Sequence, residues 1–142
     1  MKIVIGIIFL VISNIGYSDA LSSKTEAKNL AKSIMELIGK GDIQNGLKLA
    51  KPYLIIPAHE FEGVLNSLKM QAPVIEQRFG KTIGMEFAKI EESGESLMLV
   101  VYLQKFEKHL MRWKFYFYKG KDGWVLNTFN TDDQIQLMFS GH

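Results

Sequence analysis

The hydrophobic pattern of this chain changes its period once, near Met85. Before that point, apolar residues recur every three or four positions, as on one face of an amphipathic helix. From Met85 to Asn130 they alternate with polar residues, and Val, Tyr, Phe and Trp become frequent, as in half-buried strands. Helices followed by strands are typical of an α+β fold, in which helices gather on one face of an antiparallel sheet. The order does not favour a parallel α/β fold, which would alternate the two.

Three helices are predicted in the first part of the chain. The first begins at the S-x-x-E capping pattern of Ser23 and ends at the glycines of segment 39–41. A short second helix, capped by Asp42, ends before Pro52. The third has the clearest helical period, and Pro73 is expected to kink or split it. Its apolar positions are Phe61, Val64, Leu65, Leu68, Ala72, Ile75 and Phe79.

Four antiparallel strands are predicted at residues 85–91, 96–106, 110–118 and 124–130, followed by a short helical tail. In the third strand, Trp113, Phe115 and Phe117 point to one face, because strand side chains alternate. With a three-residue turn at 107–109 and a five-residue turn at 119–123, both neighbouring strands place apolar residues opposite these aromatics. We therefore predict that this face packs against the helices to form a curved sheet with helices on one side.

Two polar residues are expected on this predicted core face. Asn127 would lie among the aromatics, and a four-residue first turn would place Glu86 next to Val101. An unpaired buried amide costs about 1–3 kcal/mol, so Asn127 should have a partner or line a wet cavity. We predict a ligand-binding pocket formed by Glu86, Val101, Trp113, Phe115 and Asn127. In the alternative, Asn127 bonds a neighbouring loop and Glu86 lies at a solvated sheet end.

The opposite face of the predicted sheet is unusually apolar for a solvated surface. Large apolar side chains there would form a patch wider than monomers usually expose. We predict a homodimer or partner interface on it, unless the tail or the first helix covers it. The predicted interface residues are Met98, Val100, Tyr102, Tyr116, Tyr118, Trp124 and Leu126.

Motifs for catalysis, metals and cofactors are not recognisable in the sequence. The histidines at 59, 109 and 142 lack metal-ligand spacing, and neither a phosphate-binding glycine loop nor a G-x-S-x-G run occurs. The paired carboxylates at 91–92 and 132–133 fall in turns and caps, where such residues face water. Lysines are spread among acids, and the net charge is only +2, which does not predict a nucleic-acid partner. We predict no catalytic residue, metal or cofactor.

The N-terminal segment has the three regions of a secretory signal peptide. Lys2 precedes an apolar run at residues 3–12, and small polar residues follow. Cleavage is expected before Leu21, or alternatively before Asp19. The apolar run of about ten residues is shorter than the roughly 20 that span a bilayer, so no stable membrane anchor is expected after cleavage. The chain has no cysteine and hence no lipid-attachment cysteine or disulfide, which predicts a periplasmic or secreted single domain at residues 21–142.

Two segments carry a resemblance to a known superfamily. These are Leu37-Ile38-Gly39-Lys40-Gly41-Asp42, which closes the first helix, and the hairpin from Arg112-Trp113-Lys114-Phe115-Tyr116-Phe117-Tyr118 to Asp122-Gly123-Trp124. With the order of helices before strands, they resemble small exported members of the nuclear transport factor two-like superfamily, which includes ketosteroid isomerase and scytalone dehydratase. The resemblance implies a cone-shaped α+β fold with a pocket between helices and sheet. A cystatin-like roll is the alternative, and no catalytic residue of the superfamily maps onto this chain.

The sequence therefore predicts an exported, non-catalytic module that binds a small apolar ligand or a protein partner. One alternative is an isomerase-, dehydratase- or hydrolase-like enzyme with Glu86 as general base and Asn127 as hydrogen-bond donor. Another is a dimerising subunit of an envelope or secretion assembly.

Overall fold

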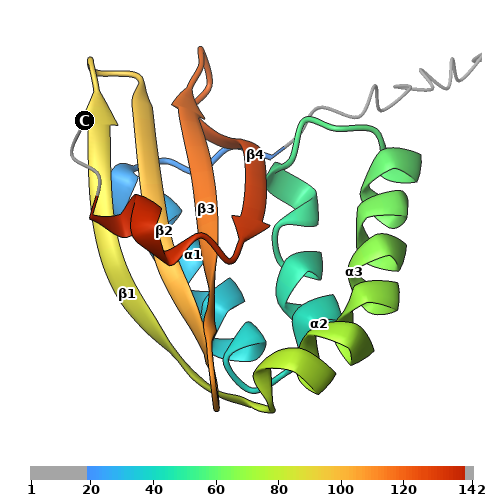
Figure 1. Ribbon diagram of the computed structural model, residues 1–142. Coiled ribbons are helices and arrows are strands. Elements are labelled where there is room, and N and C mark those ends of the chain that lie inside the picture. Colours follow the sequence, from blue (N-terminus) through green and yellow to red (C-terminus); the bar gives the residue numbers. More distant parts are fainter. Residues whose placement is uncertain (1–18, 140–142) are drawn as a thin grey trace, which may run out of the picture.

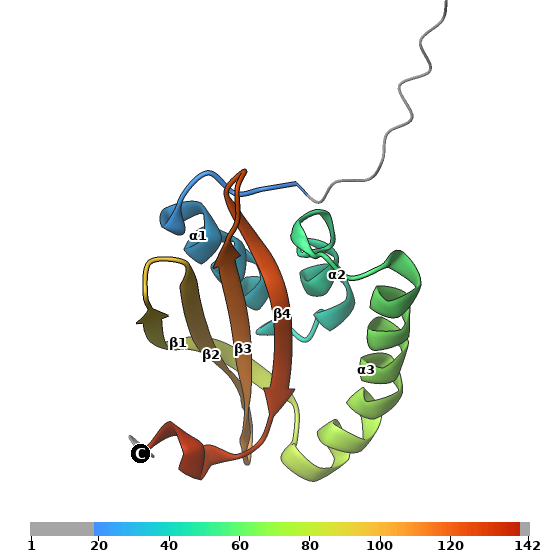
Figure 2. The same ribbon diagram turned by 90° about the horizontal axis from the view of Figure 1, so that it is seen from above.

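The predicted α+β architecture is confirmed by a computed structural model, which describes residues 19–139. A curved four-stranded antiparallel sheet has the order β1-β2-β3-β4. Helices α1, α2 and α3 lie along its concave side, and the short helix η2 lies on the other side (Figures 1 and 2). The elements are α1 Lys24–Ile38, α2 Ile43–Lys48, η1 Lys51–Tyr53, α3 Ala58–Phe79, β1 Thr82–Ser93, β2 Leu97–Phe106, β3 Leu110–Lys119, β4 Trp124–Asp132 and η2 Ile135–Met138.

Helix α1 begins at its predicted cap and packs tightly on the sheet. The Ser23 hydroxyl accepts from the Glu26 N–H at 3.1 Å, and the Glu26 carboxylate accepts from the Ser22 N–H at 2.7 Å. Gly39 follows the helix with ordinary right-handed backbone, so its role is not the left-handed stop that the sequence predicts. A Cβ at this position would lie 2.9 Å from Met85 Cβ. Glycine is thus required here for close approach to β1, and Gly41, at φ 87°, makes the left-handed turn.

Helix α3 runs unbroken through Pro73 and curves towards the sheet at its C-terminal end (Figures 1 and 2). The predicted split does not occur. Three of its side chains are buried, Phe61 and Leu65 near the start and Phe79 at the end. The middle of the helix stands farther from the core, which leaves room beneath it.

The predicted strand register is wrong in all three hairpins, because every turn is shorter than expected. The offset is one residue between β2 and β3, one residue near the turn and two beyond Tyr116 between β3 and β4, and two to three residues between β1 and β2. Backbone pairing of Phe106 with His109 leaves a two-residue turn between β2 and β3, and pairing of Gly120 with Gly123 does the same between β3 and β4. Trp113 consequently lies opposite Tyr102 rather than Leu103. A one-residue slip moves every side chain of a strand to the other face.

Most of the predicted interface therefore lies in the core. Met98, Val100, Tyr102, Trp124 and Leu126 are all buried with the aromatics of β3, on the face that meets the helices. Of the seven residues, Tyr116 and Tyr118 alone remain on the outer face. The broad apolar outer surface expected from the sequence does not exist in this form, and η2 packs against β3 on that side.

The segment before α1 covers the free edge of β4. The Leu21 N–H donates to the Trp124 carbonyl, and the Trp124 N–H donates to the Leu21 carbonyl, each at 2.8 Å. Leu21 itself is buried. Residues 1–18, most of the predicted signal peptide, lie outside the described residues. Within residues 19–139, no helix is long and apolar enough to cross a membrane.

Candidate functional site

A cavity of about 290 Å³ lies between helix α3 and the sheet, and we call it the α3 cavity. Its walls are mainly apolar. Helix α3 contributes Leu68, Ala72 and Ile75, and the sheet contributes Phe106, Met111 and Trp113. It forms here because the partly exposed middle of α3 spans the space between its buried ends.

A chain of buried polar groups crosses the sheet side of the α3 cavity. The Trp113 indole N–H donates to the Gln104 side-chain oxygen at 2.9 Å, and the Gln104 amide donates to the Thr82 hydroxyl at 3.1 Å. Gln104 is only 1% exposed and Trp113 is 0% exposed. Their hydrogen bonds offset the cost of burying an amide and an indole N–H, and they fix both side chains in place.

Thr131 completes the polar part of the cavity wall. It lies opposite Trp113 in the β3–β4 pairing and lines the same cavity. Its hydroxyl oxygen is buried and has no hydrogen-bond partner within the described residues. Thr82, Gln104 and Thr131 are the uncharged polar residues that line the α3 cavity.

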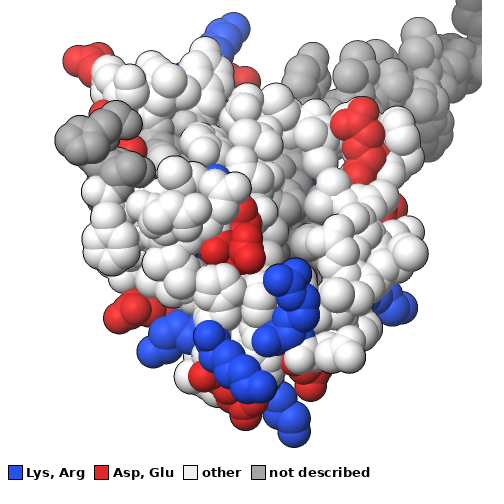
Figure 3. All heavy atoms as spheres, in the orientation of Figure 1, with Lys and Arg blue, Asp and Glu red and all other residues white. Residues whose placement is uncertain are grey.

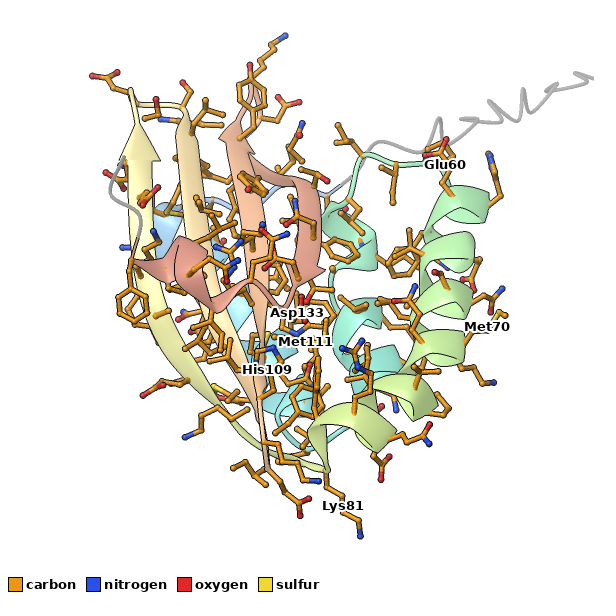
Figure 4. All side chains as sticks on the ribbon, viewed as in Figure 1. Glu60, Met70, Lys81, His109, Met111 and Asp133 are labelled. Atoms are coloured by element: carbon orange, nitrogen blue, oxygen red, sulfur yellow. The ribbon has the colours of Figure 1, made fainter. Side chains whose placement is uncertain are left out.

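The charged groups of the α3 cavity lie at its rim. Lys40, Glu76 and Lys81 line it and are exposed. Lys81 lies at the narrow end of the molecule, where basic and acidic side chains are intermixed on the surface (Figures 3 and 4). The interior of the cavity is thus nearly neutral, and the charges remain in water.

Beside the cavity, His109 and Asp133 lie near Met111 between the sheet and α3 (Figure 4). His109 Nε2 is 3.5 Å from Asp133 Oδ2, and its ring stands edge-on to Phe79 with centroids 4.5 Å apart. This contact ties the start of β3 to the end of α3 and to the segment after β4.

An ion-pair cluster lies on the outer face of the sheet at the end of β4. Its central residue is Asp132, which follows Thr131 in the sequence. Asp132 accepts from Arg112 Nε and Nη2 and from Lys114 Nζ, each at 2.7 Å. Arg112 is 5% exposed. The hydrogen bonds from Arg112, and then those from Lys114 and the Gln134 N–H, hold the pKa of Asp132 far below its ordinary value. Because neighbouring side chains point to opposite faces, this cluster also orients Thr131 towards the cavity.

The five predicted pocket residues do not come together. Trp113 lines the α3 cavity, and Phe115 is buried in the core beyond it. Val101 is buried on the outer side of the sheet, opposite Lys114, and Glu86 is exposed opposite Leu103. Asn127 is exposed at an irregularity in the β3–β4 pairing. Glu86 and Val101 share a face as predicted, but the slip between β2 and β3 turns that face outwards, and Asn127 falls at the irregularity after Tyr116. Their predicted place on the core face is therefore wrong.

Sequence reasoning missed Gln104, Thr82 and Thr131 as site residues. Gln104 did carry a signal, since it is a polar residue on the apolar side of an alternating strand. The predicted register placed that side outside, where a glutamine needs no explanation. Thr82 and Thr131 lie just beyond the predicted strand ends and carried no signal.

No group of three or more His, Asp or Glu side chains within residues 19–139 could hold a metal ion. Comparisons of the chain with protein-family models, curated proteins and solved structures found no match. The function must therefore be argued from the α3 cavity itself.

Proposed function

We propose that this protein is an exported, non-catalytic module that binds a small, mainly apolar molecule in the α3 cavity. The observation that carries the proposal is an apolar cavity of about 290 Å³ with a few fixed polar groups in its wall. An engineered apolar cavity of about 150 Å³ is known to bind benzene. The α3 cavity therefore has room for a molecule of about two fused rings.

The position of the proposed general base does not support the catalytic alternative. Glu86 is exposed on the outer side of the sheet, and neither Glu86 nor Asn127 lines the α3 cavity. A carboxylate that does not line the cavity cannot reach a proton of a molecule bound there. Binding without chemistry is the function that these positions favour.

A homodimer or an envelope assembly stays a prediction without the surface that motivated it, since five of the seven predicted interface residues are buried. Membership of the nuclear transport factor two-like superfamily likewise stays a proposal. It is supported by the order of helices before sheet and by a cavity between them.

Naphthalene tests the binding proposal directly. Equilibrium dialysis of the wild-type protein should show saturable binding at one site. Ala72→Trp should abolish it, because the indole would fill the cavity beneath α3. Ala58→Trp is the matched control, since Ala58 is exposed on the same helix and does not line the cavity. Absence of saturable binding to the wild type, or equal binding to both variants, would overturn the proposal.

A further inference from the structure

Two lysines, Lys40 and Lys81, lie at the rim of the α3 cavity, and the backbone of each is fixed by hydrogen bonds. The Lys40 N–H donates to the Leu37 carbonyl at 3.0 Å, in the turn where Gly41 has φ 87°. The Lys81 N–H donates to Glu107 Oε2 at 3.3 Å, and the Lys81 carbonyl accepts from the Glu107 N–H at 3.1 Å. Both side chains therefore start from fixed points beside the cavity.

The charges at this rim do not neutralise one another. Within residues 19–139, the ion pairs include neither lysine, nor the carboxylate of Glu76, which is the third charged group in the cavity wall. Two neighbouring acids do not line the cavity. Glu107 accepts from the Lys81 N–H, and Asp133 lies 3.5 Å from the His109 ring. The rim thus carries two positive charges against one negative charge, which suits an anion.

The interior of the α3 cavity does not suit an ion. Gln104 and Trp113 are paired with each other there, and the charged lining residues are all exposed. An ion at this depth would lack an opposite charge, which is far costlier than leaving it in water. An anionic group on a bound molecule therefore has to remain at the rim, while the apolar part fills the interior.

We propose that Lys40 and Lys81 form an anion-binding rim and that the ligand of the α3 cavity is a compact apolar molecule with one carboxylate. The inference rests on the proposed function and names the class of ligand. Each lysine ammonium group ends a flexible four-carbon chain, so it can follow a carboxylate at the rim. The apolar walls select the body of the ligand, and the lysines select the sign of its charge.

The test compares two probes with the same rings and opposite charges, 2-naphthoate and 2-naphthylmethylammonium. Equilibrium dialysis of the wild-type protein at pH 7 and low ionic strength should show about threefold to tenfold tighter binding of 2-naphthoate, because each ion pair in water adds only a small factor. This preference should shrink in about 0.5 M salt, which screens exposed charges. Ala72→Trp should abolish binding of 2-naphthoate, because the indole fills the cavity that its rings would occupy.

A double variant removes the two rim charges. Lys40→Met with Lys81→Met keeps the apolar part of both side chains, and it should lose the preference for 2-naphthoate, because Glu76 is then the one charged residue that lines the cavity. Lys48→Met with Lys69→Met is the matched control. It changes the net charge equally, and both residues are exposed and do not line the cavity. The control should keep the wild-type preference.

The outcomes separate this inference from the proposed function. If naphthalene does not bind the wild type, the proposed function itself fails. If naphthalene binds but 2-naphthoate is not preferred over the cation, the anion-binding rim is overturned while cavity binding stands. Retention of the preference in the double variant, or binding of 2-naphthoate that survives Ala72→Trp, overturns it as well. The wild-type comparison needs no variant, so the inference remains testable even if a variant does not fold.

Discussion

At the scale of single residues, two neighbouring residues of β4 lie on opposite faces of the sheet. Thr131 faces the α3 cavity, and Asp132 faces the outer side, where it joins Arg112 and Lys114. Arg112 is almost fully buried, so the carboxylate of Asp132 compensates a guanidinium charge that has little contact with water. A buried charge that loses its partner is strongly destabilising.

Asp132→Asn should lower the free energy of unfolding at pH 7 by about 2–4 kcal/mol, because it leaves Arg112 buried without a counter-charge. Urea denaturation followed by circular dichroism would measure this. Asp133→Asn is the control, since the Asp133 side chain is half exposed and, within residues 19–139, its one ion-pair contact is with the His109 ring at 3.5 Å. A loss below about 0.5 kcal/mol in Asp132→Asn would contradict the assignment.

The same ion pair predicts a pH dependence. The pKa of Asp132 is lowered in the folded protein, so the unfolded state takes up its proton first as the pH falls. The stabilisation is complete above the pKa of an unfolded aspartate, about 3.9, and is lost progressively below it. The difference in unfolding free energy between wild type and Asp132→Asn should therefore narrow from pH 5 to pH 2.5. An unchanged difference would contradict the lowered pKa.

At the scale of elements, α1 and α3 are held very differently. Helix α1 buries five side chains completely, namely Ala27, Ala31, Ile34, Met35 and Ile38. The longer α3 buries three, placed towards its two ends, and spans the cavity with its middle. Segments with few buried contacts open locally at lower free energy than the core.

Hydrogen exchange should show this difference. After correction for intrinsic rates, amides in the middle of α3, residues 66–75, should exchange at least roughly tenfold faster than those of α1. Saturating naphthalene should slow amide exchange in α3 and leave the exchange rates of α1 unchanged, because a ligand that contacts α3 stabilises its folded, packed state. Equal protection of the two helices would contradict the expectation that α3 opens at lower free energy than α1.

At the scale of the whole molecule, the segment before α1 belongs to the folded domain. Leu21 is buried and pairs with Trp124 at the edge of β4, and the Asp19 N–H donates to the Pro52 carbonyl at 2.8 Å. A Cβ on Gly123 would lie 2.5 Å from the Leu21 carbonyl oxygen, so the fold admits this pairing only with glycine there. An edge strand covered in this way is also protected from pairing with other chains.

This contact limits where an exported form can begin. If the proposed signal peptide is removed, the mature chain should start at Leu21, or alternatively at Asp19, because later cleavage would remove a residue of the core. Intact-mass spectrometry of protein isolated from the cell envelope would identify the first residue. A full-length mass, or a start beyond Leu21, would contradict the prediction.

The sequence by itself determined the type and order of the elements. Hydrophobic period, the Ser23 cap and the glycine-containing turns are local properties, and they located α1, the strands and the α+β class. Local pattern also identified Trp113 and Phe115 as inward-facing, since three aromatics alternate with polar residues in one strand.

Only the tertiary structure decided which residues of the other strands share that face. Side chains alternate with a period of two, so the inward set depends on whether each turn has an odd or an even number of residues and on every bulge. The turn at Glu107-Lys108 is one residue shorter than expected, and the turn at Lys121-Asp122 is three residues shorter. The strand pairing is also irregular after Phe87 and Tyr116. The slip between β2 and β3 thereby brought Gln104 into the cavity wall and turned the face of Val101 and Glu86 outwards, while Asn127 fell at the irregularity after Tyr116.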